Sequence, residues 1–348
     1  CDSILKTNLR SAVTQDLVSA ADLRKTASRI FLLYFKLGMF DPVSDQPMAK
    51  FNDTSIIAGP MHQQLALDAA RESICLLQNP SLLPLQLSGS QAIASLAVVG
   101  PGANLTDAFI GEYSPVPCGD STSACMQTVV GAIKSVTVNS NVKLVHAVGC
   151  MDGHACTVLN TSSVAEAAKD TQVTVLIIGI KPDEALNGEE KATSGEGIDR
   201  LTTGLPGRQR ELCEAVIATG KPVVLVVAGG GSISVDFAKD HPHVAVLSIG
   251  AGGFAGAQAL AEVIFGLVNP SGRLPHTVYR SNWQQITPMR DMSMQAGAGR
   301  SYRWLDVAAS PPLWSFGDGL SYTNFALQLA KERRSGSELR YEATVTNR

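Results

Sequence analysis

Five short apolar segments, each ending in glycine, do most to limit what this chain can fold into. The segment VTVLIIG at 173–179 is so uniformly apolar and β-branched that it predicts a strand covered on both faces, as in a parallel sheet between two helix layers. Helix-like sequence lies between several of the segments, and this alternation is typical of a doubly wound sheet. The sequence therefore predicts an α/β fold with a mostly parallel sheet. The five segments are 95–100, 143–149, 173–179, 222–229 and 244–250.

A polar loop follows the most apolar of these segments. Residues 181–200, KPDEALNGEEKATSGEGIDR, contain six carboxylates. Loops at the carboxyl ends of parallel strands carry the ligand chemistry of open α/β sheets. A carboxylate in this loop is therefore a candidate catalyst, and the other acidic side chains are expected to be solvated surface charges.

The overall composition excludes several classes of partner. The 348 residues are 45% hydrophobic and 17% charged, and the formal charge of −3 provides no basic field that would attract nucleic acid. No apolar run reaches the roughly 18 residues of a membrane-spanning helix. The length suggests two domains, or one large domain with appendages. We therefore expect neither nucleic acid nor a membrane as a partner.

The glycine-rich turns do not predict a nucleotide or metal cofactor. VVGPGAN at 98–104 lacks the third glycine and the later acidic residue of a dinucleotide site, and AGGGSIS at 228–234 lacks the Walker lysine. Cys150, His154 and Cys156 lack a fourth zinc ligand, and the two cysteines fit a disulfide better. We therefore expect no cofactor and no metal.

The first 60 residues differ from the rest of the chain. A capping box of Ser19 with Asp22 and apolar residues at helical spacing predict a helix at 19–37. Residues 41–60 are rich in Pro, Asp and Ser and predict a linker. A second helix is expected at about 61–77, before the first of the apolar strands.

The C-terminal residues predict a third kind of structure. Apolar and polar residues alternate in FALQL and LRYEATVTN, as in half-buried antiparallel strands. Two or three strands cannot form a stable sandwich by themselves. We expect these residues to be the beginning of a β domain whose remainder is missing from the chain.

Cysteines and sequons bear on the cellular compartment. Cys118 with Cys125, and Cys150 with Cys156, are each spaced closely enough to close a small disulfide loop. Disulfides and sequons in polar loops are compatible with secretion. The first ten residues are not a signal peptide, so the protein is either cytosolic or the true beginning of the chain is absent. The sequon asparagines are Asn52, Asn104 and Asn160.

Three long strings give the chain a family resemblance. ESICLLQNPSLLPL, AGGFAGAQALAEVIFGLVNPSGRLPHTVY and PLWSFGDGLSYTNF resemble the strongest signatures of the C-terminal part of glycoside hydrolase family 3. HQQLALDAARESICLL, IGEYSPVPCG, VGCMDGHACT, PMRDMSM and GRSYRW are more similar to the β-xylosidase and α-L-arabinofuranosidase branch than to the β-glucosidase branch. The resemblance covers nearly the whole chain.

The resemblance implies a domain organisation. Members of the family place a TIM-like barrel first, then a linker, an α/β sandwich and often a fibronectin type III-like domain. By this resemblance residues 1–40 are the end of the barrel domain, 41–60 the linker, 61–318 the α/β sandwich, and 319–348 a truncated fibronectin type III-like domain. The chain is therefore expected to be a fragment, and the missing barrel is its expected partner.

The resemblance also implies a role for one carboxylate. SGEGIDR at 194–200 resembles the SGEGxDR string in which several family members keep their acid/base Glu, so Glu196 is the predicted general acid/base. The glycines beside it let the backbone approach a sugar closely. The loop is longer than in many xylosidases of this branch, and Glu190 is the runner-up. Asp199 and Arg200 are expected to form an ion pair that shapes the loop.

We therefore expect part of a secreted, retaining, exo-acting glycoside hydrolase that acts on xylo-oligosaccharides or arabinosides. The Asp nucleophile would lie on the missing barrel, so the 348 residues alone are expected to be inactive. Two alternatives remain: a β-glucosidase of the same family, and a non-catalytic carbohydrate-binding or scaffolding module. The choice among xylose, arabinose and glucose stays open, because it depends mainly on barrel residues.

Overall fold

The structure is a computed structural model that divides into two units, Cys1–Gly59 and Pro60–Arg348, which we describe separately. It describes residues 2–46, 59–111, 126–181, 200, 202–283, 292–293, 302–308 and 310–348. In this part of the chain no helix is long and apolar enough to cross a membrane.

The first unit contains two helices, α1 (Asp2–Thr14) and α2 (Ala20–Lys36). The predicted capping box is confirmed: the Ser19 hydroxyl accepts a hydrogen bond from Asp22 N at 3.1 Å, and Ser19 N donates to Asp22 Oδ2 at 3.3 Å. Such a box satisfies two backbone donors that a helix start leaves without intrahelical partners. A short 3-10 helix, η1 (Val43–Asp45), follows within the predicted linker.

The second unit is built on a six-stranded sheet with the order β1-β6-β5-β4-β2-β3. The five strands predicted from the apolar segments are confirmed and run parallel to one another, whereas β1 pairs with β6 in the antiparallel direction. The fold is therefore a mostly parallel α/β sheet. The strands are β1 (Cys75–Gln78), β2 (Ser95–Val99), β3 (Lys143–Ala147), β4 (Val173–Gly179), β5 (Val223–Ala228) and β6 (Val244–Gly250).

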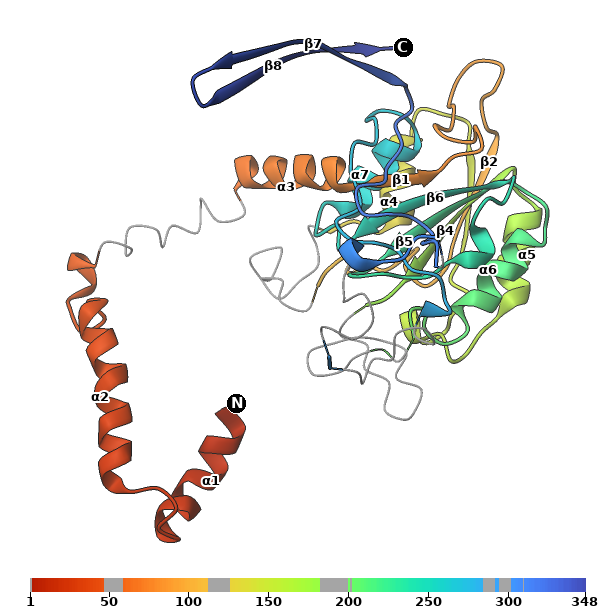
Figure 1. The fold of residues 1–348 in the computed structure, drawn as a ribbon. Coiled ribbons are helices and arrows are strands. Elements are labelled where there is room, and N and C mark those ends of the chain that lie inside the picture. Colours follow the sequence, from red (N-terminus) through yellow and green to blue (C-terminus); the bar gives the residue numbers. More distant parts are fainter. Residues whose placement is uncertain are drawn as a thin grey trace. The chain divides into compact units, whose positions relative to one another are not determined.

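Helices cover both faces of this sheet (Figure 1). Strand β4 supplies side chains to both cores: Val175 and Ile177 pack on one side, and Leu176 and Ile178 on the other. All seven residues of β4 are buried, which explains its uniformly apolar sequence. One layer contains α3 (Pro60–Ser73), α4 (Val129–Val136) and α7 (Gly256–Ile264), and the other contains α5 (Thr161–Lys169) and α6 (Gln209–Ile217).

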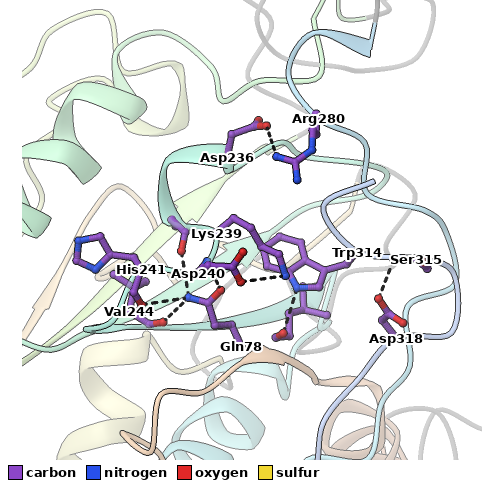
Figure 2. Close-up of polar contacts among 12 residues, drawn as sticks. Gln78, Asp236, Lys239, Asp240, His241, Val244, Arg280, Trp314, Ser315 and Asp318 are labelled. Carbon is purple, nitrogen blue, oxygen red and sulfur yellow. Dashed lines mark hydrogen bonds and ion pairs between the residues drawn. The ribbon is translucent and has the colours of Figure 1, made fainter. Parts of the chain in front are cut away.

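The predicted helix at 61–77 is confirmed over most of its length and is wrong only at its last four residues. Helix α3 ends at Ser73, and Cys75–Gln78 forms the edge strand β1. A short apolar run fits either a helix or a strand by periodicity, and here long-range partners decide between them. The Gln78 amide donates to Val244 O at 2.8 Å and to Ala238 O at 3.0 Å, and its oxygen accepts from Asp240 N at 2.7 Å (Figure 2).

A tryptophan packs against the same edge strand. Trp314 is 4% exposed, and its indole N–H donates to Leu77 O at 3.0 Å (Figure 2). The Lys239 ammonium lies 4.9 Å from the centroid of the Trp314 ring, a cation–π distance. The segment containing Trp314 thus closes one side of β1, while β6 closes the other.

The chain ends in an antiparallel hairpin of β7 (Phe325–Ser335) and β8 (Glu338–Asn347). Alternation along both strands predicted this pairing, which the structure confirms. Leu327 lies opposite Val345, and both side chains are more than half exposed. The identification of these residues as the start of a fibronectin type III-like domain stays a prediction, as do the other domain boundaries.

An ion pair joins the helices α3 and α7. Arg71 donates to both carboxylate oxygens of Glu262, at 2.5 and 2.9 Å, and Glu262 is 8% exposed. Asp68 also accepts from Arg71, at 2.8 Å, but lies nearer the solvent. Burial raises the pKa of Glu262, and the hydrogen bonds from Arg71 and Gln258 outweigh this effect and lower it below its usual value.

We expect Glu262→Gln to lower the free energy of unfolding by about 1.5 to 3 kcal/mol at pH 7, the range for hydrogen bonds to charged groups. The Glu262 pKa is lower in the folded state, so this stabilisation is present above the unfolded pKa of about 4.3 and is lost as the pH falls through the folded value. Urea titrations monitored by tryptophan fluorescence at several pH values would measure the difference between variant and wild type. Asp68→Asn, which removes the more exposed partner of Arg71, is the matched control and should cost less. An equal loss for Glu262→Gln at pH 3 and pH 7 would contradict the assignment.

Candidate active site

The candidate site is built where the central strand β4 ends. Gln209 is fully buried, and its oxygen accepts from Gly179 N at 2.9 Å while its amide donates to Gly179 O at 2.8 Å. The same amide donates to His154 O at 2.6 Å. A Cβ at Gly179, where φ is 141°, would lie 1.8 Å from Ala228 O, so only glycine fits between β4 and β5 here. The end of β4 is therefore fixed on all sides before the carboxylate-rich loop begins.

The outgoing end of the loop is fixed by two contacts. Ile180 N donates to Ala228 O at 3.0 Å, which extends the pairing with β5. The Lys181 ammonium then lies 2.7 Å from Asp107 Oδ2, and the Lys181 side chain is only 14% exposed. Asp107 comes from the turn after β2, so this ion pair ties together the carboxyl ends of neighbouring strands.

The returning end of the loop is fixed by an arginine. Arg200 Nη2 donates to Ser232 O at 2.9 Å, in the turn that follows β5. Arg200 Nη1 is also buried, and it has no hydrogen-bond partner among the described residues. Burial lowers the pKa of Arg200 from its usual value. The N–H groups on Nη1 of Arg200 therefore have no acceptor among the described protein groups.

The predicted catalytic acids lie between these two ends. Glu196 and Glu190 fall in residues 182–199, outside the described part of the chain, as does Asp199 with its predicted ion pair to Arg200. The structure therefore brings together the supports of the loop, and the roles of these acids stay predictions.

The disulfide loop of residues 150–156 supports the start of helix α6. Cys150 and Cys156 form a disulfide with a Cα–Cα distance of 4.7 Å, and the short 3-10 helix η3 (Gly153–Ala155) lies between them. Arg208 N donates to Cys156 O at 2.9 Å. Because His154 O in the same loop accepts from Gln209, the disulfide loop holds the start of α6 and, through Gln209, the end of β4.

The other predicted cysteines and sequons have different outcomes. Cys118 and Cys125, with Asn52, lie outside the described residues. Asn104 is exposed in the turn after β2. Asn160 is exposed at the start of α5, where its side-chain oxygen accepts from Ser163 N at 3.2 Å.

Groups that commonly bind metals or react as nucleophiles are not gathered here. Within the described ranges no three His, Cys, Asp or Glu side chains are grouped so that they could hold a metal ion. The two free cysteines found there, Cys75 and Cys213, are buried, and burial raises the pKa of both thiols. Such thiols are poor nucleophiles, because the reactive form is the thiolate. The chemistry that the site supports best is that of the carboxylates in the loop.

Sequence reasoning missed Gln209. A signal for it existed, because Gln209 occupies the buried stripe of α6 together with Leu212, Cys213 and Val216. A glutamine at a position where the helical spacing requires an apolar side chain indicates a buried hydrogen-bonding role. The pair of Lys181 with Asp107 had no comparable signal, since its members are far apart in the sequence and each looks like a surface charge.

We expect Gln209→Leu to destabilise the α/β unit by at least about 2 kcal/mol, because it leaves the buried N–H and C=O of Gly179 without partners. Urea unfolding monitored by tryptophan fluorescence would measure this loss. Gln91→Leu makes the same chemical change at an exposed position and should change the stability by less than about 0.5 kcal/mol. Equal stability of the two variants would contradict the role of Gln209.

Comparisons with known sequences find relatives of the whole chain. Residues 74–322 match the family described as the glycosyl hydrolase family 3 C-terminal domain. "Beta-xylosidase/alpha-L-arabinofuranosidase 1" of Medicago sativa subsp. varia is 35% identical over 340 residues, which are 95% of this chain and 40% of that protein. "Probable beta-D-xylosidase 7" of Arabidopsis thaliana is 33% identical over 98% of this chain and 43% of its own length.

Solved structures resemble it as well. A GH3 exo-β-xylosidase in complex with a xylobiose aziridine activity-based probe has a TM-score of 0.71 and 27% sequence identity, and the match covers 91% of this chain and 38% of that one. The chain thus spans about two fifths of the length of these curated relatives.

Proposed function

This chain belongs to glycoside hydrolase family 3, and on that premise we propose that it is part of a retaining, exo-acting β-xylosidase for xylo-oligosaccharides. In this proposal the loop at 182–199 supplies the general acid/base, and an Asp nucleophile comes from a barrel domain outside this chain. The observation that carries the proposal is the fixation of both ends of this loop at the carboxyl edge of a parallel sheet.

The chemistry requires two carboxyl groups with different tasks. In retaining hydrolysis one carboxylate attacks the anomeric carbon, and a second carboxyl group about 5 Å away protonates the leaving oxygen and later activates water. The second group must stay in place through both steps. The described residues serve this need by holding the ends of the loop: Gln209 and Lys181 fix the outgoing end, and Arg200 fixes the returning end.

The position of the arginine favours Glu196 over Glu190. Four residues of chain span at most about 14 Å, whereas ten span up to about 36 Å. Glu196 is four residues from Arg200, which donates to Ser232 O, so in this proposal the acid stays within that reach of the fixed end of the loop. Glu190 lies nine residues from Lys181 and ten from Arg200, and neither end restricts it to the same degree. We therefore propose Glu196 as the acid/base.

The proposed substrate follows from the relatives. Curated proteins that are 33–35% identical to this chain are named β-xylosidases, some of them also α-L-arabinofuranosidases. A solved β-glucosidase from Erythrobacter marinus is 30% identical, so hydrolysis of glucosides is the second candidate within the family.

We expect Glu196→Gln in the full-length protein to lower kcat on xylobiose by about 100- to 10,000-fold, because a poor leaving group must be protonated in the transition state. The kcat on an aryl xyloside with a good leaving group should fall much less. Added azide should restore turnover of the glycosyl intermediate. Steady-state kinetics on both substrates measure this pattern, with Glu190→Gln as the matched control.

Three outcomes would contradict parts of this proposal. Full activity of Glu196→Gln with loss in Glu190→Gln would move the role to Glu190. Full activity of both variants would remove the acid/base from these two positions. A full-length protein that hydrolyses no aryl xyloside, arabinoside or glucoside would favour the non-catalytic module.

We also propose that the protein is secreted and glycosylated. The disulfide of Cys150 with Cys156 is of the kind that persists in oxidising compartments. Asn104 and Asn160 are exposed, as N-glycosylation requires. At Asn160 the side-chain oxygen caps α5, while a glycan would be attached to the nitrogen, so that both roles are compatible.

We expect mass spectrometry after alkylation without reduction to find Cys150 and Cys156 unlabelled in protein from the native source. Peptides containing Asn104 and Asn160 should shift in mass after enzymatic deglycosylation. Cys75 and Cys213, which are free and buried, provide the internal control: they should be labelled once the protein is denatured. Labelled Cys150 and Cys156 would remove the argument for an oxidising compartment.

A further inference from the structure

We propose that the stacked rings of Tyr279 and Trp283 form a platform for a sugar on the leaving-group side of the candidate site. The inference rests on the proposed function in taking the ligand to be a xylo-oligosaccharide. The ring centroids lie 4.1 Å apart with an interplanar angle of 12°, and both residues are partly exposed.

Two serines fix the backbone of Tyr279 to the turn after β5. Tyr279 N donates to Ser232 Oγ at 2.9 Å, and Ser234 Oγ donates to Tyr279 O at 2.7 Å. Ser234 Oγ also lies 2.8 Å from Thr203 Oγ1, and Ser234 N donates to Thr203 O at 2.7 Å. Thr203 follows Arg200 in the returning end of the carboxylate loop, so one set of hydrogen bonds holds both the loop and the tyrosine.

The turn between the two rings is fixed separately. Ser281 N donates to Asp236 Oδ2 at 2.9 Å, and Arg280 Nη1 lies 3.7 Å from Asp236 Oδ1 (Figure 2). Arg280 Nε donates to Pro311 O at 3.0 Å, and Trp283 N donates to Arg280 O at 3.0 Å. A stack held in this way loses little conformational freedom when a ligand binds, which favours affinity.

The chemistry of the surroundings suits a saccharide. Aromatic faces present a rigid apolar surface with a polar edge, which matches a sugar ring that is apolar on its C–H face and polar at its rim. The Tyr279 hydroxyl is protonated at neutral pH, as that of any tyrosine is, and can donate to a sugar hydroxyl; burial raises its pKa further. Arg200 bonds to the carbonyl of Ser232, the residue that holds the backbone of Tyr279.

The connection through Ser232 also indicates which part of the substrate is involved. A general acid protonates the oxygen of the leaving group, so the residues that anchor its loop border that side of the scissile bond. Ser232 contacts Arg200, four residues from Glu196, and holds the backbone of Tyr279. We therefore assign the platform to the sugar units of the leaving group, while the terminal sugar that forms the glycosyl–enzyme intermediate lies on the other side of the scissile bond.

The test uses the full-length protein and xylotetraose. Trp283→Ala should raise KM for xylotetraose about tenfold, the change expected for losing roughly 1.4 kcal/mol of stacking, with a smaller effect on kcat. Trp283→Phe should recover most of the affinity, because it restores a stacking ring. The matched control is Phe316→Ala, which removes one ring from the stacked pair of Tyr302 and Phe316 (4.7 Å, 6°) and should leave KM unchanged.

Binding without turnover separates this proposal from the proposed function. In the Glu196→Gln background, Trp283→Ala should weaken xylotetraose binding about tenfold, measured by calorimetry. If the acid/base assignment failed and Glu196→Gln still hydrolysed xylotetraose, the KM comparison between wild type and Trp283→Ala would test the platform by itself. A KM and binding constant within twofold of the parent proteins, no recovery by Trp283→Phe, or an equal loss in Phe316→Ala would each overturn the platform.

Discussion

The contact between Gln209 and Gly179 is the constraint on which the rest of the site depends. One amide side chain satisfies both polar groups of the last residue of β4, inside a core where an unsatisfied backbone group is expensive. It also reaches His154 O, and so joins α6, β4 and the disulfide loop in one place. The carboxylate-rich loop thus begins from a point that packing and hydrogen bonding hold from several directions.

Charge is distributed unevenly around this point. Lys181 is paired with Asp107, and Arg71 is paired with Glu262 between α3 and α7, so both cations are neutralised by described carboxylates. Arg200 bonds a carbonyl through one nitrogen and keeps another buried nitrogen without a described partner. A buried N–H group without an acceptor costs free energy in the ligand-free protein. A ligand rich in hydroxyl oxygens can offset this cost if it supplies the acceptor.

The sequence predicted the parts of the fold that local pattern determines. Strand β4 was predictable because VTVLIIG is apolar at every position except Thr174, as is typical of a strand buried on both faces. Strand β1 was not, because CLLQ closely follows α3 as a short apolar run that also fits a helix, and it becomes a strand only through pairing with β6 and the contacts of Gln78. The contacts that support the loop could not be predicted from the sequence for the same reason. Lys181 with Asp107 and Arg200 with Ser232 are contacts between positions that are distant in the sequence. The catalytic role of Glu196 still depends on its sequence string.

The edge strand β1 has a consequence for the order in which the unit assembles. Its two sides are closed by residues made much later: Cys75 pairs with Ser248, and Leu77 O accepts from Trp314, 237 residues further along the chain. Contacts of such sequence separation carry a large loop-closure entropy and form slowly. During synthesis from the N-terminus, the apolar residues 74–77 therefore stay unpaired until β6 and the segment that contains Trp314 have been synthesised. A chaperone would protect this protein most between the synthesis of residues 74–77 and the synthesis of the segment that contains Trp314.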